Sequence, residues 1–139
     1  MPVLPLTGGC LCGAVRYEVT ELPVSASYCH CTRCQRRSGT AASAQARVAP
    51  GSLHVVQGAE LVAEWVPPDE GWPKCFCSGC GSALWSRSRT EDGVYSVRLG
   101  TFDADPGIRP EYRQYVAYAA PWEELPDDGL PRFDERRPA

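Results

Sequence analysis

The chain has 139 residues, with 14 basic and 17 acidic side chains and a formal net charge of −3 at pH 7. This length suits one domain with its own core and is short for two. The acidic balance argues against binding to nucleic acid, because proteins that neutralise phosphates carry a basic surplus. No apolar run approaches the roughly 18 residues that span a bilayer, and no secretory signal is visible. We therefore expect a cytoplasmic protein with no nucleic-acid and no membrane partner.

Thirteen glycines, thirteen prolines and many short apolar stretches predict a turn-rich, mainly β protein with little helix. The first expected strand covers residues 14–20, where Val15, Tyr17 and Val19 share one face. Residues 53–57 and 61–66 are also strand-like, and the turn between them predicts a hairpin.

Later in the chain, residues 82–87 and 94–99 form a second expected strand pair, and residues 112–118 are the last strand candidate. Short helical pieces are expected at 32–37 and just after Thr101. From Pro121 onward Pro, Asp and Gly dominate, which predicts a tail on the domain surface. Four apolar residues are candidates to hold this tail down: Trp122, Leu125, Leu130 and Phe133.

Eight cysteines form three tight clusters, and they carry most of the functional information in the chain. A set of thiolates suits a tetrahedral metal of borderline softness, and zinc is the first candidate. The sequence around the second and third clusters shares the spacing C-x-C-x-x-C, and the first is C-x-C alone. The clusters are Cys10 and Cys12; Cys29, Cys31 and Cys34; and Cys75, Cys77 and Cys80.

Other interpretations of these cysteines fit less well. Disulfides need an oxidising compartment, and nothing in the sequence points to one. Buried structural cysteines explain one thiol but not eight in clusters, and the spacings do not follow a usual ferredoxin run. Zinc leaves two partitions open: two closed sites of four thiolates, or one closed site, one three-thiolate site and a spare cysteine. Only the second partition leaves a position for chemistry.

Three segments resemble the glutathione-dependent formaldehyde-activating enzyme family, whose domain is shared with centromere protein V. They are residues 9–17 around Cys10 and Cys12, residues 29–39 from Cys29 to Gly39, and residues 76–82 around Cys77 and Cys80. The resemblance runs from about residue 7 to 133, and it includes Pro121-Trp122 and the 128–133 segment. We expect one domain over residues 7–133 and a frayed C-terminal tail over residues 134–139.

The resemblance implies a single-domain β-tent fold stapled by zinc, with two zinc ions per chain. It implies that Cys10, Cys12, Cys77 and Cys80 hold a structural zinc, and that Cys29, Cys31 and Cys34 hold a second zinc associated with chemistry. The family reaction joins glutathione to formaldehyde, giving S-hydroxymethylglutathione, and is a carbon–sulfur lyase reaction in reverse. The expected partners are therefore a small thiol such as glutathione and a small aldehyde.

Residues near the second cluster leave alternatives open. Arg33, Arg36 and Arg37 are candidate contacts for the carboxylates of the thiol substrate, or else a solvated face. His30 is expected to pack or hydrogen-bond rather than to bind metal, with a proton shuttle as the alternative. Cys75 is either a bystander or a fourth thiolate that would close the second site.

Two further functional hypotheses come from other classes. A zinc-stabilised binding module without catalysis would require an exposed cationic tract for DNA, and the chain has only pairs of arginines. A thiol or metal sensor would use the open thiolates. The leading interpretation is a zinc-dependent carbon–sulfur lyase-like enzyme, and the oligomeric state cannot be read from the sequence.

Overall fold

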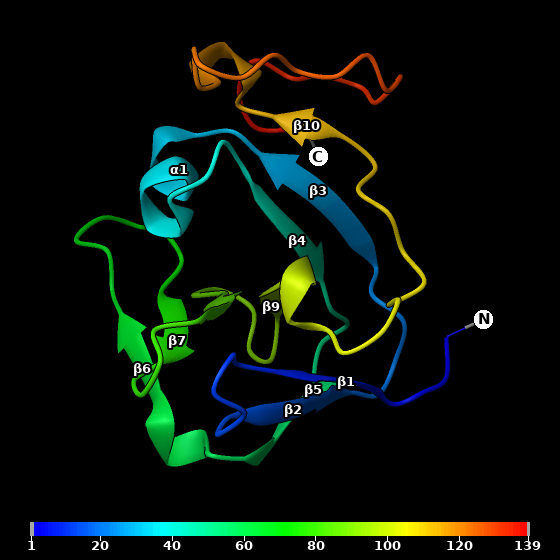
Figure 1. Cartoon of the computed structure of the whole chain (residues 1–139), viewed down its shortest axis with the longest axis vertical. Coiled ribbons are helices and arrows are strands. Elements are labelled where there is room, and N and C mark those ends of the chain that lie inside the picture. Colours follow the sequence, from blue (N-terminus) through cyan, green and yellow to red (C-terminus); the bar gives the residue numbers. More distant parts are fainter. Residues whose placement is uncertain (1, 139) are drawn as a thin grey trace.

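Two β-sheets and one short α-helix make up the computed structural model, which describes residues 2–138 (Figure 1). The mainly β class with little helix, expected from the Gly and Pro content and from the family resemblance, is confirmed. None of the helices in the described part of the chain is long and apolar enough to cross a membrane.

The smaller sheet has the strand order β1-β2-β5 and is antiparallel throughout. Its strands are β1 (Leu6–Gly9), β2 (Arg16–Val19) and β5 (Leu53–Gln57). Tyr17 and Val19 on β2 are fully buried, as the alternating pattern predicts, and Val15 just before the strand is buried with them.

The larger sheet has seven strands in the order β10-β3-β4-β9-β8-β7-β6. Only β10 pairs in parallel, beside β3. The predicted pairing of residues 82–87 with 94–99 is confirmed, since Trp85 lies opposite Val97. The strands are β3 (Ser25–Cys29), β4 (Ser43–Arg47), β6 (Val62–Trp65), β7 (Lys74–Cys77), β8 (Ala83–Arg87), β9 (Tyr95–Arg98) and β10 (Arg113–Gln114).

Apolar side chains from both sheets pack into one core. The Tyr17 ring stands edge-on to Trp85 at 5.6 Å and to Phe102 at 5.9 Å between ring centres. Each fully buried side chain of this size contributes about 1.5–3 kcal/mol to stability. Because this core uses one face of the larger sheet, alternate residues on its strands point to the opposite face, which is polar.

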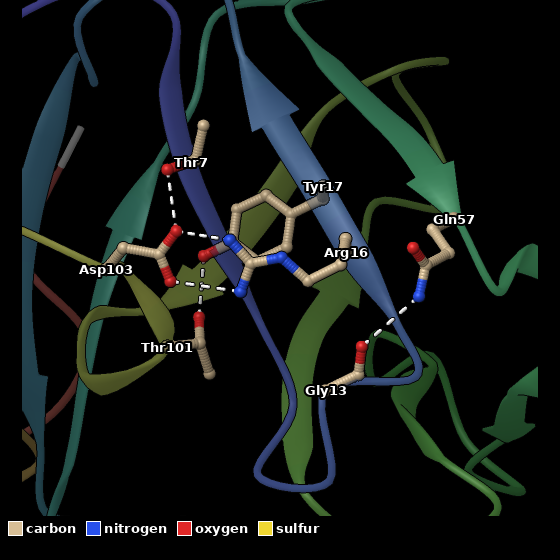
Figure 2. Close-up of polar contacts among 7 residues, drawn as sticks. All are labelled: Thr7, Gly13, Arg16, Tyr17, Gln57, Thr101 and Asp103. Carbon is tan, nitrogen blue, oxygen red and sulfur yellow. Dashed lines mark hydrogen bonds and ion pairs between the residues drawn. The ribbon is translucent and has the colours of Figure 1, made fainter.

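Polar contacts tie the smaller sheet to the segment that follows β9 (Figure 2). The Arg16 guanidinium makes an ion pair with Asp103, and the Thr7 hydroxyl donates to the same carboxylate at 2.6 Å. The Tyr17 hydroxyl lies 2.7 Å from the Thr101 hydroxyl, which belongs to the 3₁₀ turn η2 (Leu99–Thr101). These contacts fix the position of β2, and with it the cysteines that precede the strand.

The predicted hairpin between residues 53–57 and 61–66 is wrong, although both strands exist. β5 pairs with β2, whereas β6 pairs with β7 in the other sheet. Gly58, at φ 74°, and the 3₁₀ turn η1 (Ala59–Leu61) carry the chain from one sheet to the other. A Cβ on Gly58 would lie 2.1 Å from the Ala14 carbonyl oxygen, so the backbone crosses too closely for any other residue.

The helix predicted at 32–37 is present as α1 (Thr32–Ser38). The helical piece expected just after Thr101 is wrong, because η2 ends at Thr101. The strand expected over 112–118 is largely wrong as well. It shrinks to β10, because Tyr115 takes a left-handed conformation, φ 57°, and the 3₁₀ turn η3 (Val116–Tyr118) follows.

The last part of the chain returns to β10 and lies beside it (orange and red in Figure 1). The backbone N–H of Phe133 donates to the Arg113 carbonyl at 2.9 Å, and the Phe133 ring meets Tyr112 edge-on. Leu125 and Leu130 are half-buried, whereas Trp122 is 69% exposed and does not hold the tail down. The Arg137 guanidinium lies over the Tyr112 ring. Ala139, the last residue of the predicted frayed tail, lies outside the described residues.

Candidate metal centre

Cysteines from two of the three sequence clusters come together in one group of four that joins the two sheets. This group, Cys10, Cys12, Cys77 and Cys80, is the first cluster of the structure. Cys10 and Cys12 lie in the loop between β1 and β2, and Cys77 and Cys80 lie at the turn between β7 and β8. One sulfur atom from each lies within 4.8 Å of the others. The measured separations include 3.5 Å between Cys10 and Cys12 and 3.9 Å between Cys12 and Cys77. Four sulfurs held about 2.3 Å from a tetrahedral zinc lie about 3.8 Å apart, so this donor set fits zinc.

Two glycine turns give this cluster its shape. Gly13 and Gly81 both have φ 79°, a left-handed conformation that allows each chain to double back behind its cysteines. Gly13 N–H donates to the Cys10 carbonyl at 3.1 Å, and Gly81 N–H donates to the Cys77 carbonyl at 2.7 Å. The Gln57 amide holds the first turn from outside by donating to the Gly13 carbonyl (Figure 2).

Hydrogen-bond donors around the first cluster favour the thiolates of Cys80 and Cys10, whereas at Cys12 the Ala14 N–H lowers the pKa but is outweighed by the contacts with Cys10 and Cys80, which raise the pKa to about 11. The Ser82 hydroxyl, 3.1 Å from Cys80 Sγ, lowers the pKa of that thiol to about 5. Burial opposes ionisation of Cys10, but the Val15 N–H, which donates to its sulfur at 3.3 Å, lowers the pKa overall. The Ser82 hydroxyl also accepts from the Leu11 N–H at 3.0 Å, and so links the two turns. A site that stabilises negative sulfur is suited to a cation.

The second cluster is built where β3 ends and α1 begins. Cys29 is the last residue of β3, Cys31 is the N-cap of α1, and Cys34 lies in the first turn of the helix. Their three sulfurs lie within 4.8 Å of one another, and the Cys34 N–H donates to Cys31 Sγ at 3.3 Å. Hydrogen bonds from Cys29 and Cys34 lower the pKa of Cys31 to about 2, and the contact with Cys31 raises the pKa of Cys29. The trio therefore shares its protons.

The second cluster has three donors, against four in the first. Among residues 2–138, no further His, Cys, Asp or Glu joins the trio. Cys75 lies elsewhere: it is buried in the apolar core, and its thiol donates to Glu64 Oε2 at 3.4 Å. Burial is the main reason that the pKa of Cys75 rises to about 12. The alternative in which Cys75 closes the second site is therefore wrong for this structure.

A polar network that sequence reasoning missed covers the sheet beside the trio. The Ser86 hydroxyl lies 3.2 Å from Lys74 Nζ and 2.9 Å from Arg98 Nη2. Arg98 Nη1 donates to Gln45 Oε1 at 3.3 Å, and the Ser43 hydroxyl donates to the same oxygen at 2.9 Å. Ser43 in turn faces the Cys34 thiol. The sequence signal that could have found this network is that Lys74 and Arg98 each stand next to a buried residue of the same strand, Cys75 and Val97.

Electrostatic coupling shows that these cations and the trio share one environment. Burial lowers the pKa of Arg98, while the Cys34 thiol acts in the opposite direction. Burial also lowers the pKa of Lys74, and the adjacent Arg98 charge lowers it further. The thiols of Cys31 and Cys34 raise the pKa of Lys74, so both cations are within electrostatic range of the cluster.

The three arginines predicted as substrate contacts take different positions. Arg33 is exposed and forms an ion pair with Asp69. Arg36 is exposed and borders a surface pocket of about 370 Å³ on the outer side of α1. Arg37 stacks over the Phe76 ring at 5.2 Å, and its Nη2 atom is buried without a hydrogen-bond partner among the described residues. Beyond the effect of burial, the Arg37 charge lowers the pKa of Arg98, and the Arg33 charge lowers the pKa of Lys74.

The His30 side chain contacts Arg113, which pairs with Asp128 of the C-terminal segment. The side chain is buried, and its Nε2 atom lies 3.1 Å from Arg113 Nη1, which donates to it. Arg113 pairs with Asp128 at 2.8 Å and stacks over the Tyr28 ring at 4.3 Å. Burial lowers the pKa of His30, and the Arg113 charge lowers it further. This geometry supports a packing and hydrogen-bonding role.

Comparison with known proteins identifies the architecture that holds these clusters. The profile of the family described as glutathione-dependent formaldehyde-activating enzyme matches residues 5–118. The chain belongs to this family. A Halomonas elongata protein, provisionally named a glutathione-dependent formaldehyde-activating enzyme, is 34% identical over 85 residues. That segment is 58% of this chain and 54% of the relative, so the match spans about half the relative's length.

A solved structure supports the same assignment. The crystal structure of a Rhodobacter sphaeroides protein superimposes on this member of the family with a TM-score of 0.60 and 26% sequence identity. The superposition covers 91% of this chain and 98% of the other. The likeness therefore extends over nearly the whole chain.

Proposed function

We propose that the chain is a zinc-dependent carbon–sulfur lyase-like enzyme that forms and cleaves the adduct of glutathione, or a similar small thiol, with formaldehyde or another small aldehyde. In this proposal Cys10, Cys12, Cys77 and Cys80 hold a structural zinc, and Cys29, Cys31 and Cys34 hold a second one. The observation that carries the proposal is the difference between the clusters: four converging sulfurs in one and three in the other.

A three-donor site suits this chemistry because zinc bound there keeps an open position, which can hold a thiol as thiolate or polarise an aldehyde oxygen. The reaction needs no oxidant. The thiol sulfur bonds to the aldehyde carbon, the carbonyl π bond becomes an O–H bond, and the thiol proton ends on that oxygen. The reverse reaction breaks the same carbon–sulfur bond and returns the proton to sulfur.

The chain's own residues favour the thiolate form of the substrate thiol. Lys74 and Arg98 place positive charge near the trio, and a nearby cation lowers the pKa of a thiol. Arg37 adds a third cation on the helix side, and we retain it as a substrate contact. Arg33 and Arg36 stay predictions in that role. A reducing compartment such as the cytoplasm would keep the trio as free thiols, so we propose that location.

Adduct exchange measures the proposed activity directly. The zinc-loaded protein is mixed with glutathione and ¹³C-formaldehyde, and exchange between free and adduct carbon is followed by NMR exchange spectroscopy. We expect exchange at least about tenfold faster than in the protein-free mixture, a modest value for a positioned catalyst. Cys31→Ser should abolish this acceleration. Cys75→Ser is the matched control, since Cys75 lies outside both clusters, and it should keep the acceleration. Exchange at the protein-free rate would refute the proposal for this substrate pair.

A further inference from the structure

Three cations near the second cluster have no carboxylate partner among the described residues. The ion pairs among residues 2–138 involve five other arginines, and none involves Arg37, Lys74 or Arg98. All three side chains are half-buried. Because buried charges are normally paired, a group of three unpaired cations needs an anion from outside the chain.

The contacts that these cations do make are incomplete. Arg98 bonds only neutral oxygens, on Gln45, Ser86 and the Ser96 backbone. Lys74 bonds a single hydroxyl, that of Ser86, although an ammonium carries three N–H groups. Arg37 has a buried Nη2 with no partner among the described residues. A guanidinium and an ammonium with spare N–H groups are the usual donors to a carboxylate.

The charge balance indicates how much negative charge the bound anion supplies. Three thiolates and one divalent zinc together leave a single negative charge. The three cations exceed this by about two positive charges, and opposite charges attract strongly where water is scarce. A small thiol that arrives as a thiolate and carries one carboxylate nearby supplies two negative charges. Thiols without a carboxylate leave a positive charge uncompensated.

We propose that Arg37, Lys74 and Arg98 form a carboxylate-binding subsite beside the second cluster, which selects small thiols that carry a carboxylate. The inference rests on the proposed function for the identity of the ligand, but binding to the subsite does not require the reaction. Arg37 reaches it from α1, Lys74 from β7 and Arg98 from β9, so the helix and the sheet together define it.

Binding of S-methylglutathione tests the subsite separately from catalysis. This probe keeps both carboxylates, but its methylated sulfur cannot act as a thiolate. Titration into the zinc-loaded protein is followed by the ¹⁵N–¹H resonances of the arginine Nε groups. We expect Arg98 and Arg37 to shift, and Arg98→Met to weaken binding about tenfold, the size of one charge-assisted hydrogen bond. Lys74→Met should act in the same direction, and Arg98→Lys should restore part of the affinity.

Three controls keep the outcome clear. Arg109→Met removes one positive charge from an exposed ion pair with Asp105 and should leave binding unchanged. The dimethyl ester of the probe lacks both carboxylate charges and should bind weakly to the wild type and to Arg98→Met alike. Circular dichroism checks that the variants fold, and Arg37→Met and Lys74→Met provide the test if Arg98→Met does not.

Several results would overturn the inference. These are no binding of S-methylglutathione to wild type, equal affinities of acid and ester, or less than a twofold change in Arg98→Met. Acetate that shifts the same resonances at the same concentration would show a site for any small anion and refute selection of a thiol. If S-methylglutathione binds in a way that depends on its carboxylates, but the protein does not accelerate adduct exchange, the proposed function is refuted and the subsite is supported.

Discussion

Cys12 and Cys77 are 65 positions apart in the chain, yet their sulfur atoms lie 3.9 Å apart. The first residue belongs to the smaller sheet's loop and the second to the end of β7 in the larger sheet. The first cluster therefore acts across the boundary between the two sheets. A metal bound there restrains two parts of the chain that are otherwise joined through the core and the contacts of Arg16 and Tyr17.

Loss of one cluster should remove one metal ion and leave the other. We expect about two zinc ions per chain in the wild type, one in Cys77→Ser and one in Cys31→Ser, measured by inductively coupled plasma mass spectrometry. Cys77→Ser should also lower the free energy of unfolding by more than about 3 kcal/mol, because it releases the link between the sheets. Cys31→Ser should cost much less.

Cys75→Ala is the control for the metal count, because it removes a buried thiol that belongs to neither cluster. It should keep two zinc ions and lower stability by only about 1 kcal/mol through the small cavity. A loss of zinc in this variant would contradict the assignment of the donors.

The Cys75 thiol should react far more slowly than the Cys80 thiol in the folded protein. Alkylation requires the thiolate, and burial raises the pKa of Cys75 to about 12. At pH 8 only about one molecule in ten thousand carries this thiolate, since each pKa unit is tenfold. Iodoacetamide labelling of metal-free protein, followed by peptide mass spectrometry, should modify Cys80 early and Cys75 only after denaturation. Early modification of Cys75 would mean that it is accessible.

Removing the Tyr17 hydroxyl should have a small, defined cost. It lies 2.7 Å from the Thr101 hydroxyl, which itself donates to the Arg98 carbonyl. Tyr17→Phe keeps the packed ring and loses one buried hydrogen bond, so we expect a loss of about 1 kcal/mol in urea unfolding. Tyr118→Phe also removes a hydroxyl that hydrogen-bonds, but at an exposed site, and should change stability by less than about 0.5 kcal/mol. Equal effects of the two would contradict this account.

The Arg113–Asp128 pair should make the attachment of the C-terminal segment depend on pH. Hydrogen bonds from Arg113 lower the pKa of Asp128, so the folded state favours the carboxylate. Its contribution is present above the unfolded pKa of about 3.9 and is lost as pH falls through the lower folded value. Asp128→Asn should therefore lower the melting temperature by a few degrees, ~2–4 °C, between pH 5 and 7. The difference from wild type should shrink toward pH 3.

Asp127→Asn is the matched control for this comparison, since Asp127 is exposed and has no ion pair within the described residues. It should melt with the wild type at every pH. Hydrogen exchange gives a second measurement. The Phe133 amide donates to the Arg113 carbonyl and the Val116 amide to the Phe133 carbonyl, and both should exchange faster in Asp128→Asn. Unchanged protection of these amides would refute the role of the pair.

Local patterns predicted many of the elements correctly. The alternation of Val15, Tyr17 and Val19 identified β2, because periodicity depends on neighbouring residues, and the short helical piece expected at 32–37 is present as α1. Cysteine spacing alone left two partitions of the thiols open, and the two groups that meet were those implied by the family resemblance. The bounds of residues 7–133 for the domain stay a prediction.

Pairing partners and the surroundings of the second cluster were beyond local patterns. β5 and β6 looked like the two strands of one hairpin, but Gly58 sends the chain from the smaller sheet to the larger one, so each strand pairs in a different sheet. Neither Lys74 nor Arg98 was among the predicted site residues. They meet because β7 and β9 flank β8 in the larger sheet, where both side chains reach the Ser86 hydroxyl on β8.

Sequence by itself therefore determined the mainly β class and the clustering of the eight cysteines, because motif spacing and periodicity are local properties of the chain, and the resemblance carried by those motifs pointed to the family and the two donor sets. Tertiary structure decided that Cys75 is buried with Glu64 rather than at the trio, and that Arg37 rather than Arg33 lies beside Arg98. Those outcomes depend on strand order and on which face of each strand points to the core. A single sequence encodes these relations only through contacts between residues far apart in the chain.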